Sequence, residues 1–100
     1  MTSYNKLVRD KIPEILDQKG ILYEKRIAGD EEYKVELIKK LEEEVKEFSS
    51  AGAADELADV LEVIEAIRKL PEYDSVEKLR QEKRAERGGF DGRIILKGEK

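Results

Sequence analysis

Four acidic residues stand at a spacing that could gather their carboxylates in one place. Glu44 and Glu47 are three residues apart, and so are Glu56 and Asp59. On a helix, residues at positions i and i+3 are neighbours on one face. Residues 48–55, between the two pairs, contain two serines and a glycine, which predict a break between two helices. A short connection makes the helices antiparallel neighbours, so two carboxylates from each helix would point into one gap.

A helical wheel at about 100° per residue indicates which way these carboxylates face. On the first helix, Glu44 lies at the edge of the apolar side and Glu47 lies further round the same edge. On the second helix, Glu56 falls inside a wide apolar arc and Asp59 borders it. The apolar positions are Leu37, Ile38, Leu41, Val45 and Phe48, then Leu57, Val60, Leu61, Val63, Ile64, Ile67 and Leu70. The outward positions of the second helix are Glu62, Glu65 and Lys69.

Acidic side chains on an outward face are solvated and need no special explanation. Acidic side chains on an apolar face do need one. Ionised carboxylates on a buried face are costly unless they are paired or bind a metal, and converging carboxylates repel one another strongly at low effective dielectric. Magnesium or manganese takes oxygen ligands and keeps water molecules that a phosphate substrate can replace. The pattern therefore favours a divalent-cation site. The alternative is a glutamate-rich helical hairpin with surface ion pairs, because ExxE spacing is common in helices.

These residues also carry a family resemblance. EEVKE followed by ELAD, at residues 43–47 and 56–59, resembles the EExxE…ExxD signature of the MazG-like, all-α NTP pyrophosphatases. YNKLVRDKIPEIL, at residues 4–16, resembles the opening of the small phosphoribosyl-ATP-pyrophosphohydrolase-like, house-cleaning members. KRAERGGFDGRIIL, at residues 83–96, resembles their ending. The match covers nearly the whole chain, and the three blocks together are more specific than ExxE alone.

The resemblance implies a single MazG-like nucleotide pyrophosphohydrolase domain over residues 1–100. Such a domain hydrolyses nucleoside triphosphates, here non-standard or damaged (d)NTPs, to monophosphate and pyrophosphate with Mg²⁺ or Mn²⁺. Carried over by position, the metal ligands are Glu44, Glu47, Glu56 and Asp59. Water is the expected nucleophile, activated by Glu47 or alternatively by Glu43. Phosphoribosyl-ATP hydrolysis and a non-catalytic dimeric interaction module stay open as other functions.

Basic residues at both ends of the chain are candidates for phosphate binding. On a helix predicted over residues 74–87, Val76 and Leu79 define the inward face, and Lys83 and Arg87 continue that face at helical spacing. Cations on a rigid helix can hold a polyphosphate that faces a metal. The alternative is that they pair with nearby glutamates. Two N-terminal cations in the opening block complete the candidate phosphate contacts, which are Lys6, Arg9, Lys83 and Arg87.

Turn and cap signals predict an all-α helical bundle built on the antiparallel hairpin. Asp10 can cap a first helix that Gly20 ends, and Asp30 can cap the long helix. Pro71 ends the second hairpin helix, and Asp74 with a glutamate three residues on forms a capping box for the last one. Short β strands are expected near residues 21–28 and 92–97, where β-branched residues gather.

Composition narrows the class of protein. Of 100 residues, 44% are charged and 39% are hydrophobic, so one small domain with a modest core is expected. Wide apolar arcs on a long hairpin predict burial between chains, in a homodimer or homotetramer. The absence of Cys and His excludes thiol nucleophiles, disulfides and zinc sites built on those residues.

Net charge and hydropathy indicate which kinds of partner the chain can bind. The net charge of −4 argues against polymeric nucleic acid as a partner. No hydrophobic run reaches transmembrane length and no signal peptide is visible, so we expect a cytoplasmic protein without a membrane partner. The expected partner is a nucleoside triphosphate substrate.

Overall fold

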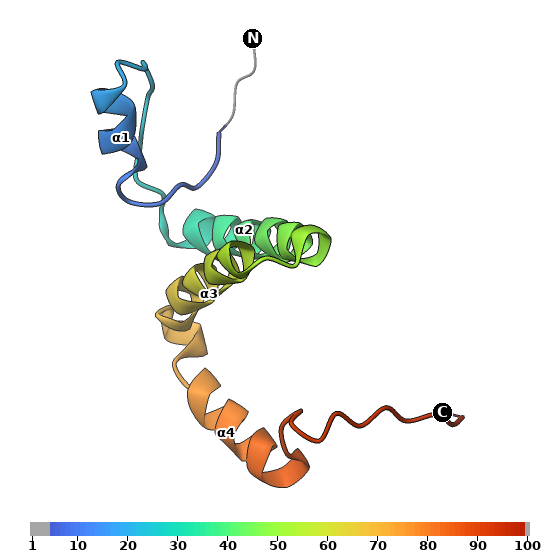
Figure 1. Ribbon diagram of the computed structural model, residues 1–100. Coiled ribbons are helices and arrows are strands. Elements are labelled where there is room, and N and C mark those ends of the chain that lie inside the picture. The colour runs from blue at the N-terminus through green and yellow to red at the C-terminus, as the bar shows by residue number, and fades with distance from the viewer. Residues whose placement is uncertain (1–4, 100) are drawn as a thin grey trace.

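The computed structural model describes residues 5–99, so Tyr4 of the opening block lies outside the described residues. Every regular element over this range is a helix, which confirms the all-α prediction. The elements are α1 (Ile12–Gln18), α2 (Asp30–Ala51), α3 (Ala54–Arg68), the 3₁₀ turn η1 (Pro71–Tyr73) and α4 (Val76–Arg87) (Figure 1). The main helix–helix contact joins α2 to α3.

The break between α2 and α3 is shorter than residues 48–55. Helix α2 continues through both serines to Ala51, and Gly52 ends it with φ 63° and ψ 17°. Glycine adopts this left-handed conformation without steric cost. The Gly52 amide donates a hydrogen bond of 2.7 Å to the Phe48 carbonyl oxygen. Gly52 and Ala53 alone therefore connect the two helices, which contact each other (Figure 1).

The predicted acidic caps do not form. Asp30 is the first residue of α2 rather than its N-cap. Lys11, not Asp10, occupies the N-cap position of α1, and its side chain makes no capping hydrogen bond. Ser75 is the N-cap of α4 and makes no side-chain capping bond. Glu77, the expected partner in the capping box, accepts hydrogen bonds from arginines instead. Charge-assisted bonds from arginine are stronger than a bond from a neutral backbone amide, so the glutamate turns away from the cap.

The two predicted strands are wrong. Residues 21–28 and 92–97 contain no strand or bridge. A strand needs a neighbouring backbone that satisfies its amide and carbonyl groups, and neither segment pairs with one in the described chain. Their large apolar side chains are 49–96% exposed, namely Ile21, Leu22, Ile27, Ile94, Ile95 and Leu96. These two segments have high β propensity but no pairing partner, so they remain irregular.

The hydrophobic core is small and lies between α2 and α3. Among the described residues, the buried hydrophobic side chains are Leu37, Val60 and Val63. The radius of gyration is 18.1 Å and the dimensions are 56 × 32 × 24 Å, whereas a compact domain of this length has a radius of about 13 Å. Helix α4 extends away from α2 and α3 (Figure 1). A single chain thus leaves many large hydrophobic side chains exposed, on the helices as well as in the irregular segments.

None of the described helices is both long and apolar enough to span a membrane. The longest, α2, has 22 residues and carries lysines and glutamates along its length.

Candidate metal centre

Three carboxylates from two helices converge at the α2–α3 contact. Glu44, Glu56 and Asp59 each bring one oxygen within 4.8 Å of the others. Glu44 lies on α2, while Glu56 and Asp59 share one face at the start of α3. Contact between α2 and α3 brings that face close to Glu44. Three of the four predicted ligands are therefore brought together, and we call them the acidic trio.

Glu44 is the buried member of the trio, with 7% of the residue exposed. It lies seven residues after the buried Leu37 on the same face of α2, so helix packing itself removes it from solvent. Its Oε1 lies 3.5 Å from Lys40 Nζ. Its Oε2 is buried and accepts no hydrogen bond from the described residues. Leaving such an atom unsatisfied costs about 1–3 kcal/mol, which a cation bound among the three carboxylates would offset.

The electrostatic environment opposes ionisation of Glu44. Burial raises the pKa of its carboxyl group above the ordinary value, and the negative charge of Glu47 raises it further. Lys40 lowers this pKa, and Asp59 adds to the increase. Together these effects shift the preference towards the neutral carboxyl group, relative to a glutamate in water, when no cation is bound. A divalent cation would reverse this preference, because it stabilises the ionised form of each ligand.

Asp59 has a cationic partner from a distant part of the chain. Arg9 Nη2 donates a hydrogen bond of 2.7 Å to Asp59 Oδ1, across fifty residues of sequence. Arg9 precedes α1, whereas Asp59 lies on α3. The contact therefore brings the N-terminal segment beside the acidic trio, where the sequence predicted a phosphate-binding arginine.

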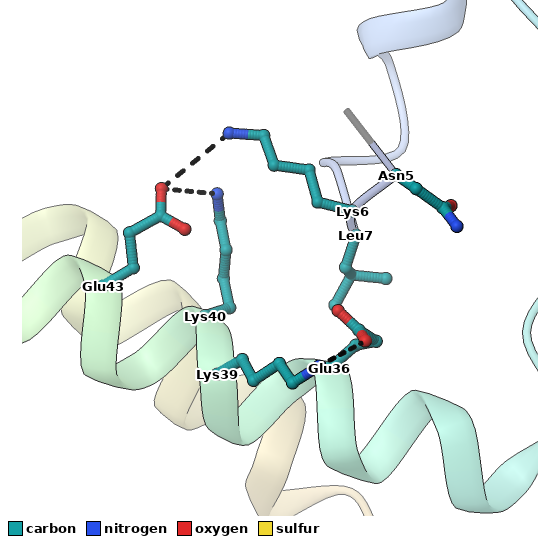
Figure 2. Close-up of a pocket in the computed structure, with 7 residues that line it drawn as sticks. All are labelled: Asn5, Lys6, Leu7, Glu36, Lys39, Lys40 and Glu43. Carbon is teal, nitrogen blue, oxygen red and sulfur yellow. Dashed lines mark hydrogen bonds and ion pairs between the residues drawn. The ribbon is translucent and has the colours of Figure 1, made fainter. Parts of the chain in front are cut away.

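Glu47 and Glu43 lie outside the acidic trio. Glu47 is exposed, although its charge reaches Glu44. Glu43 pairs with Lys6 at 3.9 Å and with Lys40 at 3.6 Å (Figure 2). Glu43 is thus engaged by two lysines, whereas Glu47 is open to water one turn from Glu44. The roles of Glu47 as a fourth ligand and of either glutamate as the base stay predictions.

A hollow of about 210 Å³ lies beside Glu43 (Figure 2). Its lining comes from residues 5–7 and from Glu36, Lys39, Lys40 and Glu43. Lys40 was not among the residues predicted from sequence, although it contacts both Glu43 and Glu44. Its position three and four residues before these glutamates, the spacing of helical ion pairs, was the available signal.

Lys83 and Arg87 do not approach the acidic trio within one chain. Both are exposed on α4, which leads away from α2 and α3 (Figure 1). The predicted inward face of α4 is also open, because Val76 is 38% exposed and Leu79 is 51% exposed. The helix predicted here is present as α4, but its apolar side is largely exposed in the single chain.

Comparisons of the chain with protein-family models, curated proteins and solved structures give no match. The resemblance to the MazG-like pyrophosphatases therefore stays a prediction that rests on the three sequence blocks.

Proposed function

We propose that this chain is a Mg²⁺-dependent nucleotide pyrophosphohydrolase, with Mn²⁺ able to replace Mg²⁺. Its substrates would be nucleoside triphosphates, in particular non-standard or damaged (d)NTPs, and its products a monophosphate and pyrophosphate. The observation that supports this most is the buried, unpartnered Oε2 of Glu44 within the acidic trio. Acidic clusters are common on charged helices, but a buried carboxylate oxygen without a partner is not. Carboxylate oxygens are also the donors that Mg²⁺ and Mn²⁺ prefer.

Each nearby residue has a role in this proposal. Glu44, Glu56 and Asp59 would hold the cation, and Glu47, one turn from Glu44 on α2, would serve as a further ligand. A bound Mg²⁺ supplies charge neutralisation at the phosphate oxygens. Glu47 is the preferred base for the attacking water because it is exposed to solvent. Glu43 is the weaker candidate, since its carboxylate is engaged by lysines.

We also propose that the α2–α3 pair is an antiparallel hairpin that works in a homodimer or homotetramer. Five aliphatic side chains on these helices are 39–53% exposed, namely Val35, Ile38, Val45, Leu57 and Leu61. A second copy that covered them would supply the core that the extended single chain lacks. Lys83 and Arg87 could then reach the acidic trio of a neighbouring copy. Light scattering should report a multiple of 11.5 kDa, and a monomer at micromolar concentration would contradict the assembly.

The function is tested by pyrophosphate release from a panel of standard and damaged dNTPs with Mg²⁺. We expect equal amounts of monophosphate and pyrophosphate, and no release when EDTA removes the metal. Phosphoribosyl-ATP belongs in the same panel, and a strong preference for it would favour that alternative substrate. No release from any triphosphate, together with no heat on titration with Mg²⁺ or Mn²⁺, would contradict the enzyme and favour an interaction module.

A further inference from the structure

The N-terminal segment makes two cationic contacts to acids on two different helices. Lys6 Nζ lies 3.9 Å from Glu43 Oε1 on α2, and Arg9 Nη2 donates to Asp59 Oδ1 on α3 at 2.7 Å. Between them, Leu7 is half-buried and lines the hollow against α2 (Figure 2). The segment 6–9 therefore lies beside the acidic trio and brings positive charge to both helices that form it.

The contact between Arg9 and Asp59 involves a member of the acidic trio itself. A guanidinium on a carboxylate oxygen forms a charge-assisted bond. It also places a positive charge next to the position that a divalent cation would take among Glu44, Glu56 and Asp59. Two cations this close repel each other even at the dielectric constant of water. Because Arg9 is 57% exposed and Asp59 is 40% exposed, their bond is weak enough to exchange.

We propose that Arg9 is a built-in counterion of the metal-free site, which a divalent cation displaces from Asp59 on binding. The displaced guanidinium stays tethered beside the site, where a phosphate group offers it a replacement anion. Arg9 thus lowers the affinity for the bare cation and favours its binding together with an anionic substrate. This inference rests on the proposed metal site, since it assigns the competitor for that same site.

Titration calorimetry with MnCl₂ alone tests the competition directly, without any turnover. The variants are Arg9→Gln, Arg9→Lys and the control Lys11→Gln, which removes one positive charge two residues further along the chain, at the N-cap of α1, but not from Asp59. We expect Arg9→Gln to bind Mn²⁺ about fivefold more tightly than wild type, the scale of one exposed ion pair. Lys11→Gln should stay within about twofold of wild type, and so should Arg9→Lys, which retains the charge. The difference in Mn²⁺ affinity between Arg9→Gln and wild type should shrink at high salt, because exposed charges are screened.

The remaining outcomes distinguish a failure of the proposed competition from a failure of the proposed metal site. Equal affinity of Arg9→Gln and Lys11→Gln would overturn the competition while leaving the metal site standing. Weaker binding by Arg9→Gln would also overturn it, since Arg9 would then support the metal-bound state. If wild type and all three variants fail to bind Mn²⁺, the proposed function fails and the inference fails with it. Circular dichroism of each variant checks that its helices are intact.

Discussion

Glu44 and Glu77 are glutamates on helices of the same chain in opposite electrostatic situations. Glu44 is buried, one of its oxygens has no hydrogen-bond partner among the described residues, and burial raises its pKa. Glu77 accepts hydrogen bonds from Arg80 at 2.5 Å and from Arg68 at 2.8 Å. The bond from Arg80, with further help from Arg68, lowers the pKa of Glu77 to about 2.

The difference separates a carboxylate that accepts hydrogen bonds from two arginines from one whose second oxygen has no hydrogen-bond partner among the described residues. Glu77 joins the end of α3 to the start of α4 and uses cations that the chain itself supplies. Glu44 is buried by the packing of α2 on α3, and the only cation at its carboxylate among the described residues is Lys40. A buried acid with too few partners gains more from an external cation than one that is already paired. Three changes test this distinction.

The largest expected effect is on turnover. Glu56→Gln removes a ligand from the acidic trio while keeping its size, so we expect pyrophosphate release to fall by about 100-fold or more. The matched control is Glu62→Gln on the same helix, whose exposed side chain lies away from the trio. The control should keep wild-type activity. Unchanged release by Glu56→Gln would refute the assignment of the site.

A smaller effect is expected on stability without metal. The folded-state pKa of Glu44 is raised, so its ionised form destabilises the fold at pH 7, and this cost disappears as the pH falls and the group protonates. Glu44→Gln mimics the neutral form and should raise the free energy of unfolding by about 1 kcal/mol at pH 7. Urea denaturation in EDTA measures this, with Glu62→Gln as the control. A destabilised Glu44→Gln would mean that Lys40 already satisfies the carboxylate.

The smallest effect concerns Glu77. Its pKa falls from 4.5 to about 2 on folding, so its stabilisation is present above pH 4.5 and is lost as the pH falls towards 2. Glu77→Gln should therefore melt below wild type at pH 7, and the two should converge at low pH. The difference should be modest because the side chains of Glu77 and both arginines are at least partly exposed to solvent. Thermal melts followed by circular dichroism measure it, and a constant difference at every pH would contradict the ion-pair account.

Individual residues show which features of the structure a local sequence pattern can predict. Apolar spacing predicted both long helices, Gly52 marked the turn between them, and the spacing of Glu56 and Asp59 placed both acids on one face. The same kind of reasoning failed for the strands at 21–28 and 92–97. Strand formation depends on a pairing partner from elsewhere in the chain, which no local pattern can supply.

Helix positions and the acidic spacing depend on neighbours a few residues away, so they could be read from the chain alone. The burial of Glu44, the exposure of Glu47 and the bond from Arg9 to Asp59 could not. Each depends on how α2 crosses α3 and on where the N-terminal segment lies, which are contacts between residues far apart in sequence. Tertiary packing decides which acid loses its solvent and which one gains a cation, because both follow from what fills the space around each carboxylate.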